Sequence, residues 1–195
     1  MCCADDEMSA AERKQKLRLA VRSGRPGSSE GLTEQLIDLT GKLAARRVGC
    51  YVSAAEEPNT LPFLSWAQHN LDEVYTPTIE GDEMRWHQYL GDLEPGRFGI
   101  GVSSGPEIDV TELDLVIMPA LAATAEGCRL GRGGGFFDRA ISKVRTSRSK
   151  ITPAFAAIVF DAELLSNLPS EAHDQIVDFV VTPSRVFGST SQFGK

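Results

Sequence analysis

The sequence predicts a single-domain α/β fold with three α/β/α layers, in which a mostly parallel, Rossmann-like sheet carries helices on both faces. Apolar runs typical of strands alternate with segments of helical spacing, and this order is typical of parallel sheets. The chain has 195 residues, 42% apolar and 24% charged, which is ordinary globular usage. We find no repeat or second linker within residues 1–195, and only 1–8 and 188–195 are expected to be flexible.

The N-terminal part predicts two helices. Ser9-Ala10-Ala11-Glu12 has the form of a capping box and opens a basic helix through about Val21. A loop rich in Gly, Ser and Pro follows at 22–30. A second helix then places leucines at the spacing of a core face: Leu32, Leu36, Leu39 and Leu43.

The middle of the chain predicts short strands and one helix. Asn59 and Pro62 open a short helix through about Asn70, and 93–96 is a turn. The alternation of Met84, Trp86 and Gln88 indicates a strand with one apolar face. The expected strands lie at 48–52, 73–77, 84–88 and 98–102.

The C-terminal part predicts the centre of the sheet. An apolar strand at 113–121 leads through a glycine-rich loop into a helix at 137–144, and a polar loop follows at 146–150. Two further apolar runs predict central strands at 153–160 and 177–181, with a short helix at 162–168 between them.

The glycine-rich loop is the strongest functional signal. The run from Arg129 to Arg139 reads RLGRGGGFFDR, with four glycines in five positions. Such a backbone can turn its amide N–H groups into one concavity and bind anionic oxygens, and the helix that follows adds its positive end. Arg132 adds a cationic side chain, and Asp138 could carry a magnesium ion beside phosphates. The loop therefore predicts an ATP site.

Two common nucleotide-binding motifs do not fit this loop. A Walker A motif needs Gly, four residues, then Gly-Lys-Ser/Thr, and counting from Gly127 its sixth position is Arg132 rather than Gly. In a dinucleotide fingerprint, Phe136 would occupy the place of the third small residue. From the residues alone, a plain glycine turn with Asp138 favouring the helix dipole stays open.

Charge and apolar patterning exclude several classes of protein. A net charge of -7 argues against a general nucleic-acid or anionic-membrane surface. No apolar run approaches the ~20 residues that span a bilayer, and the N-terminus lacks the apolar region of a signal peptide. Cys2, Cys3, Cys50 and Cys128 show no metal-ligand or disulfide spacing. We therefore expect a cytoplasmic protein that binds neither nucleic acid nor membrane, with a monomer favoured.

A second motif points to a different enzyme class. The segment 101–105 fits G-x-S-x-G, in which Ser103 would be the nucleophile of a hydrolase, with His173 as base and Asp138 or Asp161 as the orienting acid. That mechanism needs a helix directly after the serine, whereas Pro106 and β-branched residues follow here. The context favours a simple Ser/Gly turn.

The amino-acid sequence of the glycine loop resembles the signature of one enzyme family. Gly127 to Arg139 is similar nearly throughout to the loop G-x-R-L-G-x-G-G-G-Y-Y-D-R of the 5-formyltetrahydrofolate cyclo-ligase, or methenyltetrahydrofolate synthetase, family. Other similar stretches follow in the family's order: Met118 to Leu121, Leu168 to Asp174, Val177 to Pro183, and more faintly Lys14, Arg18, Glu57 to Thr60 and Phe98 to Ile100. Only the glycine loop is specific by itself.

The resemblance implies a reaction and its cofactors. These are the ATP- and magnesium-dependent cyclisation of 5-formyltetrahydrofolate to 5,10-methenyltetrahydrofolate, with release of ADP and phosphate through a phosphorylated formyl intermediate. The substrate would be a reduced folate. Arg132 is the candidate for stabilising transition-state charge.

The resemblance also implies the binding residues. Those expected at the nucleotide are Lys14, Arg18, Arg129, Leu130, Gly131, Arg132, Gly133, Gly134, Gly135, Phe136 and Phe137. Without it, Lys14 and Arg18 would be read as a solvated helix face. Glu57 matches a substrate-contacting acid, while Met84 and Trp86 are either apolar walls of the substrate site or ordinary strand packing. Asp138 and Asp174 are the expected magnesium carboxylates, although Asp174 could instead be a turn acid.

Several positions depart from the family pattern. Phe136 and Phe137 replace a usual Tyr pair, and Thr124 and Glu163 stand where many relatives have Asp and Gln. The segment from Gly101 to Pro106 replaces a usual Ile-x-Glu-Pro. These departures leave two alternatives open: a relative that binds nucleotide or reduced folate without turnover, and an ATP-dependent ligase for a different substrate.

Overall fold

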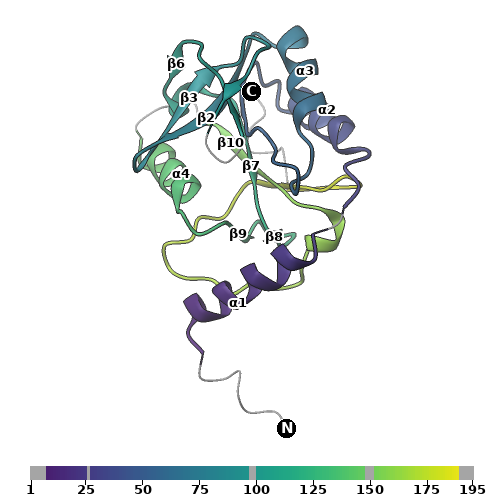
Figure 1. Ribbon diagram of the computed structural model, residues 1–195, viewed down its shortest axis with the longest axis vertical. Coiled ribbons are helices and arrows are strands. Elements are labelled where there is room, and N and C mark those ends of the chain that lie inside the picture. Colours follow the sequence, from purple (N-terminus) through teal and green to yellow (C-terminus); the bar gives the residue numbers. More distant parts are fainter. Residues whose placement is uncertain (1–7, 26, 97–99, 148–151, 189–195) are drawn as a thin grey trace.

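The computed structural model describes residues 8–25, 27–96, 100–147 and 152–188 (Figure 1). Its centre is an eight-stranded sheet of order β12-β11-β10-β7-β1-β2-β3-β6. The five central strands run parallel: β11 (Phe179–Val181), β10 (Ala154–Ile158), β7 (Leu115–Pro119), β1 (Arg47–Cys50) and β2 (Glu73–Glu80). The antiparallel edges are β12 (Val186–Gly188) on one side and β3 (Glu83–Gln88) with β6 (Glu107–Ile108) on the other. The predicted mostly parallel α/β sheet is confirmed.

Helices cover both faces of this sheet. Helices α2 (Leu32–Lys42) and α3 (Leu61–Asn70) pack on one face, and α4 (Phe136–Thr146) packs on the other (Figure 1). Strand β7 serves both cores, because Leu115 and Ile117 face α2 and α3 while Val116 and Met118 face α4. A strand buried on both faces explains why this stretch is apolar without alternation.

Helix α1 (Ala10–Ser23) covers neither face. It lies across the end of the sheet, beside a small hairpin of β8 (Ala122–Ala123) and β9 (Arg129–Leu130) (Figure 1). Leu17 and Val21 of the helix pack against a cluster at this end that includes Leu121 and Leu130. The expected capping box is present, since Ser9 and Glu12 exchange hydrogen bonds. This position brings Lys14 and Arg18 of α1 into contact with the loops at the end of the sheet.

The expected helix at 162–168 is wrong in extent. Only a 3₁₀ turn, η3 (Asp161–Glu163), forms there. The next residues extend along the β8–β9 hairpin instead: Leu164 forms a bridge with Ala123, and the Leu165 amide donates to the Ala123 carbonyl. Tertiary backbone pairing has overridden the helical spacing of this short segment.

The middle of the chain also differs in detail. Strand β2 runs on to Glu80 and forms a hairpin with β3, turning at Gly81, whose φ is +61°. Part of the expected turn at 93–96 is a two-residue strand, β4 (Glu94–Pro95), which pairs with β5 (Gly101–Val102). Residues 97–99 lie outside the described residues and include the first two residues of the expected strand at 98–102; residues 1–7 and 189–195 also lie outside them. A 3₁₀ turn, η2 (Val110–Glu112), then leads into β7. Among the described residues, no helix is both long and apolar enough to cross a membrane.

Candidate active site

The strand order reverses between the carboxyl ends of β1 and β7, and we call the region beyond these two strand ends the crevice. Strand β1 pairs with β2 on one side and with β7 on the other, so the chain changes direction of winding at this point. Ligands of open α/β sheets bind at such switch points. The loop after β1 (51–60) and the segment after β7 (120–135) meet here under α1.

The glycine loop joins β9 to α4 at this edge. Gly133 has φ +104°, and Gly135, the residue before α4, has φ +67°. Both are left-handed conformations that favour glycine. A Cβ at Gly131 would meet nothing within 4 Å, so this side of the loop is open. The loop is therefore left accessible to a ligand at the amino end of α4.

One side of α1 docks onto this loop. Lys14 is 4% exposed, and its Nζ donates to Glu171 Oε2 at 2.7 Å and to Asp174 Oδ1 at 2.7 Å. Burial alone would lower the pKa of Lys14, but these hydrogen bonds outweigh it and raise the pKa. Arg18, one turn later, donates from Nε to the Gly131 carbonyl at 3.0 Å. The structure thus brings Arg18 to the glycine loop and Lys14 to the segment that holds Glu171 and Asp174.

Arg129 links the loop to the segment around Gln175. Its Nη2 lies 2.7 Å from Asp138 Oδ1, and its Nη1 donates to the Gln175 carbonyl. The Gln175 amide donates to the same Asp138 oxygen at 3.1 Å. Burial lowers the pKa of Arg129, although Asp138 opposes that shift. These contacts hold the Arg129 guanidinium between Asp138 and the Gln175 carbonyl.

Arg132 meets the predicted substrate acid directly. Its Nη2 lies 2.8 Å from Oε1 of both Glu56 and Glu57. The Glu57 carboxylate is almost fully covered and also accepts from the Ala54 amide at 2.9 Å. The predicted catalytic cation and the predicted folate acid therefore share one ion pair across the crevice.

The two predicted magnesium carboxylates lie on neighbouring parts of one network. Asp138 contacts the Gln175 amide, and Asp174 is the preceding residue. Burial would raise the pKa of Asp174, but hydrogen bonds from Lys14 and the Glu171 amide lower it. Candidate ligand atoms of Glu171, His173 and Asp174 lie within 4.8 Å of one another. Carboxylate oxygens of this kind fit a hard cation such as Mg²⁺.

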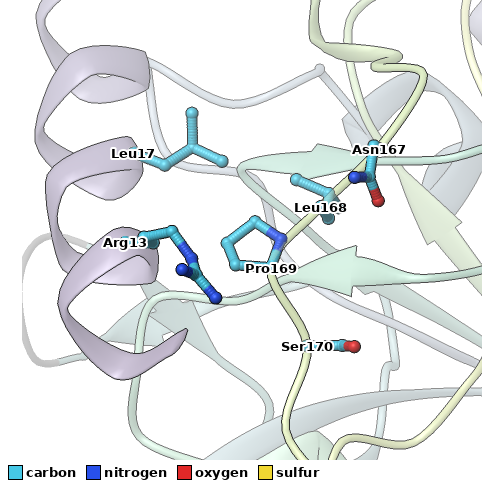
Figure 2. Close-up of a pocket in the computed structure, with 6 residues that line it drawn as sticks. All are labelled: Arg13, Leu17, Asn167, Leu168, Pro169 and Ser170. Carbon is cyan, nitrogen blue, oxygen red and sulfur yellow. The ribbon is translucent and has the colours of Figure 1, made fainter. Parts of the chain in front are cut away.

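An open cavity of about 610 Å³ adjoins this network. It lies between α1 and the segment before Glu171, and Figure 2 shows the α1 side chains opposite Leu168 and Pro169. Its lining residues are Arg13, Leu17, Asn167, Leu168, Pro169 and Ser170. The open space therefore lies between α1 and the 167–170 segment, next in sequence to Lys14 and Glu171.

Comparison with known proteins shows the family of the chain. Residues 7–183 match the 5-formyltetrahydrofolate cyclo-ligase family. The chain belongs to this family. The 5-formyltetrahydrofolate cyclo-ligase of Mycolicibacterium smegmatis is 32% identical over 181 residues, which cover 88% of this chain and 90% of that protein. That of Mus musculus is 23% identical over 186 residues, with the same coverage.

A solved structure supports the fold independently. The NMR structure of Aquifex aeolicus 5,10-methenyltetrahydrofolate synthetase covers 93% of both chains with a TM-score of 0.74 at 23% identity. Membership of the cyclo-ligase family makes this chain an enzyme of the ligase class and confirms the resemblance carried by the glycine loop.

Trp86 is a core residue rather than a wall of the family's substrate site. It is 1% exposed and contacts Phe137 edge-on, with ring centroids 6.5 Å apart. Gly49 makes room for the ring, because a Cβ there would lie 2.6 Å from it. Met84 packs against the same cluster under α4 but stays partly exposed. For Trp86, the packing alternative is the one that the structure supports.

The other departures from the family pattern have distinct surroundings. Phe136 lies under the Arg139 guanidinium, 4.7 Å from its ring centroid, and so substitutes a cation–π contact for a hydroxyl. The Thr124 hydroxyl is buried and has no hydrogen-bond partner among the described residues. Glu163 forms a buried ion pair with Arg25, Nε to Oε1 at 2.7 Å.

The hydrolase alternative is wrong. No helix directly follows Ser103, because strand β6 begins at Glu107 instead. Ser103 is 5% exposed, and its hydroxyl accepts from Thr76 Oγ1 at 2.8 Å. A nucleophile elbow needs an exposed hydroxyl on a strand-to-helix turn.

Several residues of the site were not found from the sequence. Glu56, Glu171 and Gln175 bind the predicted cations through contacts between distant segments. No local spacing marks them, because each is an ordinary polar residue in a loop. The Arg25–Glu163 pair was also missed, although the departure at Glu163 was a signal that pointed there.

Proposed function

We propose that this enzyme catalyses ATP- and magnesium-dependent cyclisation of 5-formyltetrahydrofolate to 5,10-methenyltetrahydrofolate, with release of ADP and phosphate. The observation that carries the proposal is the glycine loop at the sheet's switch point, with Lys14, Arg18 and Arg132 around it, in a chain of the cyclo-ligase family. Anion-binding geometry and cations converge at one crevice that also holds Glu57.

The reaction chemistry explains why these groups gather. The γ-phosphoryl group passes from ATP to the formyl oxygen, which breaks the bond to ADP and makes that oxygen a leaving group. The N10 nitrogen then attacks the formyl carbon, loses its proton and expels inorganic phosphate. For phosphoryl transfer the protein has mainly to position the reactants and neutralise charge.

We assign the phosphates to the glycine loop and the α1 cations. Lys14 donates to Asp174, and Arg18 donates to the Gly131 carbonyl. A bound polyphosphate would offer these two cations stronger anionic partners. Asp138 and Asp174 would hold magnesium, which supplies charge neutralisation between the phosphates. The Asp138 oxygen we assign to the cation is Oδ2, because Arg129 and Gln175 both donate to Oδ1.

We assign the pterin to the β1 side of the crevice. The Glu57 carboxylate would accept the pterin N–H groups, and partly exposed Met84 stays a candidate apolar contact. Because Arg132 occupies Glu57 Oε1, folate binding would release this cation toward the glycine loop. The pair would then couple folate binding to the stabilisation of phosphoryl transfer.

The test is formation of methenyl product, followed by its absorbance, from 5-formyltetrahydrofolate with ATP and magnesium, alongside ADP detection. We expect product and ADP in equal amounts and no product when ATP or magnesium is omitted. ATP binding without methenyl product would refute catalysis of this reaction.

The departures from the family pattern at Thr124 and Glu163 support a second candidate function, in which the protein acts on or binds a different ligand. Both positions carry buried polar groups outside the glycine loop. An ATP-dependent ligase for a different substrate, or a binder without turnover, would keep the loop and differ there. ADP formation that rises with another N-formyl compound but not with 5-formyltetrahydrofolate would favour that ligase.

A further inference from the structure

Arg25 is almost completely buried at the carboxyl edge of the sheet. Its side chain is 2% exposed and that of its partner Glu163 is 8% exposed. Nε donates to Glu163 Oε1 at 2.7 Å, and Nη2 donates to Glu163 Oε2 at 3.2 Å and to the Ala120 carbonyl at 2.9 Å. The guanidinium also lies over the Phe160 ring, 5.7 Å from its centroid. Three sides of this group are therefore fixed.

The remaining nitrogen of the guanidinium, Nη1, is not held in this way. Nη1 of Arg25 is buried and has no hydrogen-bond partner among the described residues. An unsatisfied buried donor is costly, more so on a charged group, and such groups in native proteins call for an explanation. Because the other nitrogens are fixed by Glu163 and Ala120, Nη1 cannot turn away to find a partner in solvent.

The position of Arg25 suggests what the missing partner is. Ala120 directly follows β7, and Phe160 and Glu163 follow β10, so the guanidinium lies at the ends of the central strands. Arg25 also interacts electrostatically with Glu57 and Tyr51, which follow β1. The unpaired donor thus lies buried among the residues that follow the central strands, near Glu57, the acid to which we assigned the pterin.

Charge favours a neutral acceptor as that partner. Arg25 and Glu163 cancel each other, and Glu57 adds a negative charge that disfavours an anion at this point. A reduced pterin presents two N–H donors and a ring carbonyl oxygen along one edge. Glu57 can accept from the donors, and a neighbouring guanidinium N–H matches the carbonyl.

We infer that Arg25 is a specificity-determining residue that donates from Nη1 to the ring carbonyl oxygen of the substrate, beside Glu57. This inference rests on the proposed function, because it assumes a reduced folate as the ligand. Glu163 and Ala120 act as positioning groups that hold the donor in place. Sites built to hydrogen-bond a substrate group discriminate strongly against analogues that lack it.

The test compares two ligands in two proteins. The ligands are 5-formyltetrahydrofolate and its analogue with a 4-amino group in place of the ring carbonyl, with binding measured calorimetrically. The variant is Arg25→Lys, since lysine keeps a cation for Glu163 but lacks the second amino group of the rigid fork. We expect the parent to prefer the carbonyl ligand by about 10- to 100-fold. The variant should lose most of this preference and leave ATP binding unchanged.

A second variant covers the case in which Arg25→Lys does not fold. Arg25→Met combined with Glu163→Gln removes both charges together, so neither is left buried without its partner. It should show the same loss of preference.

Other results overturn the inference in distinguishable ways. An unchanged preference in a folded variant, or equal weakening of ATP and folate binding, would mean that Arg25 only supports the fold. A parent protein that binds no 5-formyltetrahydrofolate would overturn the proposed function and this inference together.

Discussion

The two sides of the crevice hold their charges differently. On the α1 side, the acids that pair with cations are partly exposed: 26% for Asp174, 32% for Asp138 and 55% for Glu56. On the opposite side, Arg25 and Glu163 are both nearly inaccessible to solvent. Although the Lys14 and Arg129 side chains are only 5% exposed, their partly exposed acids can exchange partners at less cost than a pair buried on both sides, whose breaking costs several kcal/mol. The α1 side is therefore suited to binding a charged ligand. The buried side is suited to recognising a neutral ligand by its shape and hydrogen-bonding groups.

The largest expected effect is at the exchangeable pair of Arg132. Arg132→Ala should lower kcat by ~10²-fold or more, because a positioned cation at the transferred phosphoryl group is lost. The matched control is Arg46→Ala, which removes an exposed ion pair with Asp72 at the amino ends of the strands and should be neutral. Equal kcat in the parent and both folded variants would remove Arg132 from the mechanism. A raised ATP KM with unchanged kcat would assign it to phosphate binding alone.

Two glycines of this region, Gly127 and Gly131, are expected to differ in how much an alanine destabilises the protein. Gly127 has φ +90°, and a Cβ there would lie 2.3 Å from the Val177 carbonyl oxygen. Gly127→Ala should cost roughly 1–3 kcal/mol in the free energy of unfolding, measured with denaturant. Gly131→Ala, where the space is open, should stay within about 0.5 kcal/mol. Equal stability of the two variants would contradict the backbone geometry described for this loop.

A smaller effect is expected at Ser103. Ser103→Ala should leave cyclisation unchanged and cost about 1 kcal/mol of stability, because the Thr76 hydroxyl loses its acceptor. Kinetics and thermal unfolding of the same preparation check both parts. Ester hydrolysis that disappears in this variant would revive the nucleophile rejected on structural grounds.

The smallest expected effect is a pH dependence on the fixed side. Burial would raise the pKa of Asp161, but hydrogen bonds from Ser184 and Thr182 outweigh it and lower the pKa. A lowered folded-state pKa contributes stability above the unfolded value of about 3.9, and this is lost as pH falls through the folded value. Parent protein should therefore lose more stability than Asp161→Asn on acidification below about pH 4. Parallel pH curves would contradict this role.

The sequence predicted those parts of the molecule whose structure depends on residues close together in the chain. The glycine loop has a left-handed backbone at Gly133 and Gly135. Only glycine adopts this conformation easily, so the glycines in the sequence predict the backbone geometry. The capping box at Ser9 and the buried strand at β7 were visible for the same reason.

The parts that were missed depend on contacts between distant segments. The segment 162–168 has helical spacing, but its backbone pairs with the β8–β9 hairpin. The assignment of Trp86 depended on which face of β3 is covered by α4, which spacing alone does not state. Arg25 and Glu163 are 138 residues apart, and nothing near either residue indicates the other.

The most direct test of the central claim follows the formyl oxygen. With 5-formyltetrahydrofolate labelled by ¹⁸O in the formyl group, the enzyme, ATP and magnesium should release inorganic phosphate that carries one ¹⁸O atom, equal in amount to the methenyl product. Mass spectrometry of the phosphate gives the answer. Methenyl product formed with unlabelled phosphate would contradict phosphoryl transfer to the formyl oxygen.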